Sequence, residues 1–133
     1  MAATLSSQSI LLVAAGGAAG AVLRFATGQG VARLFGPSAA AFPAATLLVN
    51  MLGSFLVGLL AGWLMKRGGG DNLRLLLGVG LLGGFTTFSA FTLDLFVLLE
   101  RGAATLALFY AAASLVAGVG ALWLGLILTR SLA

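Results

Sequence analysis

The stretch Gly83-Gly84-Phe85-Thr86-Thr87-Phe88-Ser89-Ala90-Phe91 decides the fold, and it lies within a charge-free run between Arg74 and Asp94. Two glycines followed by two threonines continue a helix poorly, because glycine costs about 1 kcal/mol relative to alanine and threonine is β-branched. In a bilayer, interrupted backbone is tolerated only where protein or a water-filled cavity satisfies it. Broken membrane helices commonly present carbonyl groups to an ion. The stretch therefore predicts an ion site and not a lipid contact.

The composition around this stretch is typical of an integral membrane protein. Of the 133 residues, 61% are hydrophobic and 8% are charged, whereas a soluble domain has roughly 25% charged residues. The mean hydropathy is +1.17. Because a spanning helix needs about 20 apolar residues, the charge-free runs predict four transmembrane helices, at roughly 8–33, 42–65, 73–99 and 103–129. We expect an all-α, multi-pass membrane protein that forms one four-helix unit over residues 1–133, with the third helix broken in mid-membrane.

The reactive side chains exclude several classes of protein. The chain has no cysteine and no histidine, which excludes disulfides, thiol nucleophiles and histidine metal sites. Its three acidic residues, Asp71, Asp94 and Glu100, do not assemble the active site of a soluble enzyme. The seven basic residues are scattered among helix ends, where they are typical interfacial anchors and form no nucleic-acid-binding patch. We expect neither an enzyme nor a nucleic-acid-binding protein.

Basic residues are divided almost evenly between the two sides of the predicted bundle. The side with both termini holds Lys66, Arg67, Arg74 and Arg130, and the other side holds Arg33, Arg101 and the deeper Arg24. The positive-inside rule needs an asymmetry of lysine and arginine to set one orientation. Charge alone thus leaves two alternatives open, a single orientation or insertion both ways with antiparallel pairing.

Small residues recur four apart along the predicted spans. Gly16 and Gly20, Gly58 and Gly62, and Gly80 and Gly84 are such pairs, and the last span continues the pattern with Ser114, Gly118, Ala121 and Gly125. Small residues at this spacing let helix backbones approach closely in lipid. The pattern indicates a tightly packed bundle that forms oligomers, and it carries no information about what the protein conducts.

Polar side chains within the spans are few. Asn50 is the one asparagine inside a predicted span, and Thr46 and Ser54 lie four residues to either side of it, on the same helix face. Tyr110 and Ser114 repeat this spacing on the fourth span. An unpaired amide in an apolar medium costs several kcal/mol, of order 2–7, so these polar groups need a partner. The partner of each polar face is either another helix, through a hydrogen bond, or the contents of a pore that the face lines.

Two phenylalanines and one arginine complete the candidate residues. Phe88 and Phe91 share a face directly after the predicted break, next to Thr87. Aromatic rings in membrane helices usually pack, but the positive edge of a ring can also face an anion. Arg24 lies well inside the first span. It either snorkels to the interface or makes an entrance to a pore electropositive.

Three blocks of the sequence resemble the CrcB/Fluc family of fluoride channels. Residues 16–25 (GGAAGAVLRF) are similar to its opening GGxxGAxxR-aromatic block, residues 46–55 (TLLVNMLGSF) to its TLxVNxxGxF block, and residues 83–91 (GGFTTFSAF) to its GGxTTFSTF signature. The third block is highly specific, and the three occur in order over nearly the whole chain. Two positions depart from the family pattern: Ala45 replaces a frequent glycine, and Ala90 replaces a threonine.

The resemblance implies an antiparallel, dual-topology homodimer in a prokaryotic plasma or inner membrane, with two pores and one structural sodium ion at its centre. It implies that the backbone carbonyls of Gly83 and Thr86 bind the sodium. The fluoride pore would be lined by Asn50, Phe88, Phe91, Tyr110, Ser114, Thr46 and Thr87, with Arg24 at the aqueous entrance. Fluoride would leave the cell passively, down its electrochemical gradient.

Two other functions compete with a fluoride channel. A small proton-coupled multidrug exporter is also a four-span dimer, but it needs a titratable carboxylate deep in an early span, and this chain has no acidic residue before Asp71. A purely structural membrane protein would use the glycines for packing, and it leaves the interrupted stretch and Asn50 without a purpose.

Overall fold

Four helical segments account for most of the computed structural model, which describes residues 5–37, 41–68 and 70–131. They are α1 (Ser7–Phe35), α2 (Ala44–Arg67), a third segment made of α3 (Asp71–Leu73), η2 (Arg74–Leu82), α4 (Gly83–Phe85) and α5 (Phe88–Glu100), and finally α6 (Ala104–Ser131). Each segment, with the third taken over Asp71–Glu100, is long and apolar enough to cross a membrane. The prediction of four spans is confirmed, and every boundary lies within two residues of the expected one.

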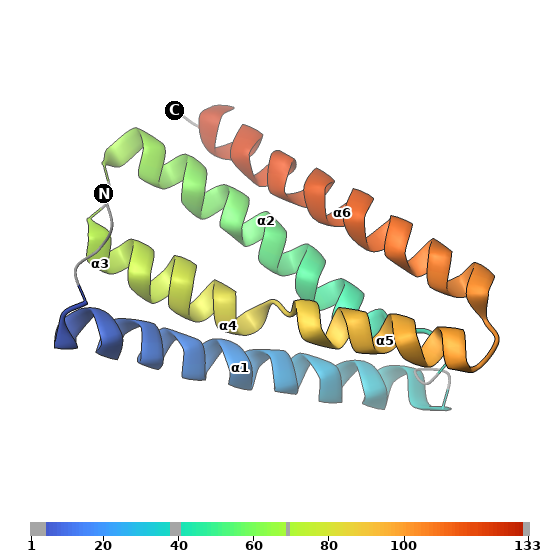
Figure 1. The fold of residues 1–133 in the computed structure, drawn as a ribbon. Helices are drawn as coiled ribbons and strands as arrows, with labels where there is room; N and C mark the ends of the chain where they lie inside the picture. Colours follow the sequence, from blue (N-terminus) through green and yellow to red (C-terminus); the bar gives the residue numbers. More distant parts are fainter. Residues whose placement is uncertain (1–4, 38–40, 69, 132–133) are drawn as a thin grey trace.

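The segments are arranged as two pairs of helices (Figure 1). The third segment lies along α1 through η2 and α4, and α2 lies along α6. The two pairs are joined where α5 turns back into α6. A buried cluster of Leu98, Ala107 and Tyr110 forms at this end, and Phe91 packs against it.

Many large apolar side chains of the described residues are exposed on the outer surface. Phe25, Leu108 and Trp123 are 67%, 73% and 65% exposed. A monomeric soluble protein rarely shows a contiguous apolar surface of this extent. The outer surface of the chain therefore requires lipid or another protein to cover it.

The α1–η2 contact depends on backbone approaching backbone. A Cβ atom on Gly16 would lie 2.2 Å from the carbonyl oxygen of Leu76, and one on Gly20 would lie 2.1 Å from that of Leu81. The two glycines are four residues apart on α1, whereas the two carbonyls are five apart on η2. Because η2 is a π-helix, whose hydrogen bonds span five residues, its wider turn matches the glycine spacing of α1. Hydropathy predicts a helix over these residues but not its type. The π-helical turn of η2 is explained by its packing against α1.

This contact makes Gly20 intolerant of a larger side chain. We expect Gly20→Val to destabilise the fold by at least about 3 kcal/mol, because overpacking against rigid backbone forces the helices apart. Gly28→Ala on the same helix is the matched control, since nothing lies within 4 Å of the Cβ it would add. The measurement is the fraction of purified protein that stays monodisperse after heating. Equal heat resistance of the two variants would contradict the role of Gly20.

The third segment is interrupted at the two threonines and not at the glycine pair before them. Thr86 (φ −75°, ψ 157°) and Thr87 (φ −150°, ψ 122°) are extended, whereas Gly83 and Gly84 remain helical. The sequence predicts a break in this stretch, but it suggests that the glycines begin it. The glycines serve packing instead, because a Cβ on Gly84 would lie 2.5 Å from the carbonyl oxygen of Gly17 on α1.

The end of α6 is tied to the end of α2 by a lysine. Lys66 Nζ donates to the carbonyl oxygens of Thr129 and Arg130, at 2.5 and 2.9 Å. The last carbonyls of a helix lack partners within the helix, and a positive charge is favourable beside them. Lys66 thus closes the α2–α6 pair at the side of the bundle that carries both termini.

Candidate functional site

Asn50 binds both backbone groups of Thr87 at the interruption. Its Nδ2 donates to the Thr87 carbonyl oxygen at 2.9 Å, and its Oδ1 accepts from the Thr87 amide at 2.8 Å. The side-chain oxygen of Asn50 replaces the backbone acceptor that an unbroken helix would supply to the Thr87 amide, and Nδ2 adds a donor to the Thr87 carbonyl. The helix–helix hydrogen bond considered for Asn50 is therefore present. One Nδ2 hydrogen remains available, because an asparagine amide has two donors.

Arg24 binds the neighbouring residue of the interruption from the other side. Its Nη1 donates to the carbonyl oxygen of Thr86 at 3.1 Å. The side chain is part-buried, and α1 continues for eleven residues beyond it, to Phe35. The guanidinium thus reaches across to the third segment and does not extend along α1 toward its end. Thr86 is thus hydrogen-bonded to Arg24 of α1, and the adjacent Thr87 to Asn50 of α2.

The threonine hydroxyls complete the local structure of the interruption. Thr86 Oγ1 donates at 2.9 Å to the carbonyl oxygen of Leu82, the last residue of η2, which also accepts from the Thr86 amide. Thr87 Oγ1 accepts from the Ala90 amide at 3.2 Å and caps the first turn of α5. The side chain of Thr86 fits because α2 has a glycine opposite it: a Cβ on Gly53 would lie 2.2 Å from Thr86 Cγ2.

A groove of about 380 Å³ opens beside the interruption, between α2, α5 and α6. It brings together five residues that the sequence analysis placed in a pore, Asn50, Thr87, Phe88, Phe91 and Ser114, and it also includes Thr86, which that analysis placed in the sodium site. Ser54, Val57, Leu115, Gly118 and Leu122 complete its lining. None of the lining side chains is charged. The groove therefore offers an amide, hydroxyls and aromatic rings on a mainly apolar wall.

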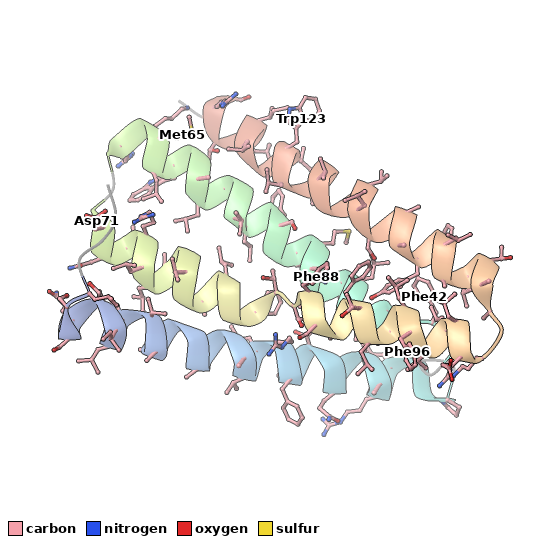
Figure 2. The ribbon with its side chains drawn as sticks, in the orientation of Figure 1. Phe42, Met65, Asp71, Phe88, Phe96 and Trp123 are labelled. Atoms are coloured by element: carbon pink, nitrogen blue, oxygen red, sulfur yellow. The ribbon has the colours of Figure 1, made fainter. Side chains whose placement is uncertain are left out.

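The two phenylalanines of the groove have different surroundings. Phe88 and Phe91 are in contact, with ring centroids 5.8 Å apart and planes inclined by 40°. Phe91 also packs on Tyr110, with centroids 5.3 Å apart. Phe88 is 75% exposed at the start of α5 (Figure 2). Phe91 is anchored in the protein, whereas Phe88 presents most of its ring outside its own protomer.

Tyr110, Thr46 and Ser114 differ in their relation to the groove. Tyr110 is fully buried behind Phe91 and makes an edge contact with Phe42. Thr46 lies beside the Tyr110 hydroxyl and does not line the groove. Ser114 does line it, and its buried Oγ lies beside the Tyr110 hydroxyl without a well-formed hydrogen bond to any residue that the structure describes. Because an unpaired buried hydroxyl is costly, Ser114 is suited to contact something that enters the groove.

Asp94 belongs to this region, although the sequence analysis did not place it there. Tyr110 Oη donates to Asp94 Oδ2 at 3.1 Å, so the carboxylate orients the phenol. Asp94 also lines a second, smaller pocket of about 250 Å³ with Arg101 and Pro43. Two signals mark it in the sequence: it is the one acidic residue in the predicted third span, and it shares a face with Phe91, three residues before it.

Backbone carbonyls are the oxygen ligands that the interruption offers to a cation. The described residues contain no group of three or more His, Cys, Asp or Glu side chains placed to bind a metal. The Gly83 carbonyl loses its α-helical donor, the Thr87 amide, because that amide bonds to Asn50. The Thr86 carbonyl accepts from Arg24 with one lone pair and keeps a second. Hard cations prefer oxygen donors, so both carbonyls fit a role as ligands of an alkali ion.

Comparison with known proteins identifies the family. The family model described as "CrcB-like protein, Camphor Resistance (CrcB)" matches residues 11–126, which include all three blocks and the interruption. The chain belongs to the CrcB family. With its four spanning segments, this CrcB protein is a multi-pass membrane protein.

Curated relatives of this CrcB chain carry the name "Fluoride-specific ion channel FluC". The protein of Novosphingobium aromaticivorans is 55% identical over 121 residues, which cover 91% of this chain and 95% of the relative. The protein of Phenylobacterium zucineum is 50% identical, with 92% and 96% covered. The protein of Mesorhizobium japonicum is 48% identical, with 93% and 98% covered. The similarity to these CrcB relatives thus extends over nearly the full length of both partners.

Proposed function

We propose that this chain forms a fluoride-selective channel in a bacterial inner membrane and exports cytoplasmic fluoride passively down its electrochemical gradient. The observation that carries the proposal is the groove, which is lined by Asn50, by Ser114 and by the rings of Phe88 and Phe91, and by no charged side chain. Several contacts of modest strength suit conduction, because an ion that binds too tightly cannot leave. The names of the relatives supply the ion.

The competing functions account for fewer of these features. A proton-coupled exporter needs a carboxylate that titrates within an early span, and Asp94, the acidic residue nearest the groove, lies in the third segment and accepts a hydrogen bond from Tyr110. A purely structural protein has no use for a groove that presents an amide and hydroxyls on a mainly apolar wall.

A liposome efflux assay distinguishes the three functions. Purified protein is reconstituted in vesicles loaded with potassium fluoride, and a fluoride electrode records release after valinomycin is added. A channel releases fluoride without a proton gradient and releases chloride far more slowly. Release that requires a proton gradient would favour the exporter, and no release from vesicles that contain folded protein would favour the structural protein.

We further propose that two antiparallel copies form the functional unit. Phe88 exposes most of its ring, and the groove is open along one side of the protomer, so a second copy is the natural cover for both. The nearly even division of basic residues supports insertion in both orientations.

Dual topology predicts that each terminus is found on both sides of the membrane. Single cysteines introduced at Ser7 and at Ser131 are expected to react with a membrane-impermeant maleimide in about half of the copies in intact cells and in all copies after permeabilisation, because equal numbers insert each way. The native chain has no cysteine, so it serves as the blank. Labelling of all copies or of none in intact cells would refute the antiparallel dimer.

Finally, we propose that one structural sodium ion lies where the two interruptions meet, bound by the carbonyls of Gly83 and Thr86 from both copies. A ligand that binds only the assembled form stabilises it in proportion to the logarithm of its concentration. We therefore expect the thermal midpoint of the dimer to rise with sodium chloride when N-methylglucamine chloride keeps the ionic strength constant. A midpoint that does not depend on sodium would remove the ion from the proposal.

A further inference from the structure

Arg24 carries a positive charge that no carboxylate compensates within the described part of the chain. One ion pair joins Arg74, at the start of η2, to Asp71 of α3, and Asp94 is hydrogen-bonded to Tyr110. The guanidinium of Arg24 instead donates to a neutral acceptor, the Thr86 carbonyl, at 3.1 Å from a part-buried position. A charge in this setting acts strongly on its neighbours, because the surroundings screen it less than water does.

The Thr86 carbonyl is also one of the two ligands proposed for sodium. A cation bound to its second lone pair would be separated from the Arg24 guanidinium by a single oxygen atom. Two like charges at such a distance repel each other, and neither can move far, since α1 and α4 are locked together by the approach of Gly84 to the Gly17 backbone.

We propose that Arg24 sets the affinity of the cation site: its charge opposes the bound sodium through the shared Thr86 carbonyl and keeps the ion exchangeable. The inference rests on the proposed sodium site and goes beyond it, because it assigns Arg24 to the cation and not only to an entrance for the anion. Arg24 acts here as a positioning and tuning residue, since it reaches the cation through Thr86.

The test measures the sodium concentration that half-saturates the rise in thermal midpoint of the dimer. Arg24→Gln removes the charge and keeps an N–H donor, so we expect the half-saturating concentration to fall by at least about tenfold. Arg24→Lys keeps the charge and should stay within about threefold of the native value. Arg33→Gln removes an exposed charge at the end of the same helix and should change nothing.

The outcomes separate this inference from the proposal on which it depends. If the native dimer responds to sodium and Arg24→Gln leaves the half-saturating concentration unchanged or raises it, the inference fails and the sodium site stands. If the native dimer does not respond to sodium, both fail. Should Arg24→Gln not fold, Arg24→Met, which keeps the apolar stem and also lacks the charge, must show the same fall.

Discussion

Asn50→Asp is expected to abolish fluoride efflux while the dimer stays assembled. The carboxylate still accepts from the Thr87 amide, but it cannot donate to the Thr87 carbonyl or to an ion in the groove. It also repels an anion: two like charges 4 Å apart cost about 4 kcal/mol at an effective dielectric constant of 20, which corresponds to roughly a thousandfold in rate. The measurement is fluoride efflux from liposomes, with dimer retention checked by size exclusion on the same preparation.

The matched control for this substitution is Asn72→Asp. It makes the same chemical change at an exposed amide in the connection that follows α2, so efflux should remain close to the native rate. Native efflux through Asn50→Asp would mean that the pore does not pass Asn50. If Asn50→Asp loses the dimer and Asn72→Asp keeps it, the two hydrogen bonds between Asn50 and Thr87 serve chiefly the structure.

Replacing Phe88 or Phe91 by isoleucine is expected to lower fluoride efflux by about two- to tenfold each, the equivalent of one aromatic edge contact of about 0.5–1.5 kcal/mol. Isoleucine keeps apolar bulk and removes the positive ring edge. The two variants should differ in stability. Phe91→Ile loses contact with Tyr110 and costs up to about 1.5 kcal/mol, whereas Phe88 is 75% exposed in its own protomer and contributes little packing there.

Phe96→Ile supplies the control on the same helix. Phe96 is 59% exposed, lies further along α5 and does not line the groove (Figure 2). Its replacement should leave both efflux and stability unchanged. If Phe88→Ile and Phe91→Ile lower stability and conduct at the native rate, both rings serve packing alone.

The four spans are predictable because each is a long apolar segment with few charged residues, and hydropathy alone locates them. The π-helix η2 is not predictable in this way, because it packs on another segment, where Gly16 and Gly20 of α1 face carbonyls that are five residues apart. The position of the interruption is missed by a few residues for a similar reason. Gly84 is read as a helix breaker, but its absent side chain accommodates the backbone of Gly17.

The candidate site is predictable in its membership and less so in its contacts. Asn50, Phe88, Phe91 and Ser114 are rare polar or aromatic residues at helical spacing, and the structure brings them to one groove. The partners of Arg24 and Asp94 depend on which helices become neighbours. A single sequence shows that a charge lies in an apolar span, but it does not show that Thr86 or Tyr110 lies opposite.

The two side chains that hold the interruption have a consequence for the order in which the protein is made. Arg24 and Asn50 both precede Thr86 and Thr87 in the chain. Both side chains are therefore already synthesised when the third segment leaves the ribosome. The interruption can form as soon as the third segment packs against α1 and α2, before α6 is synthesised and before a second copy binds. Lys66 and Asp94 must wait, since their partners are on α6. Maturation would thus proceed from a finished kink to a closed bundle, and nascent chains stalled after α5 should already contain the bent third segment.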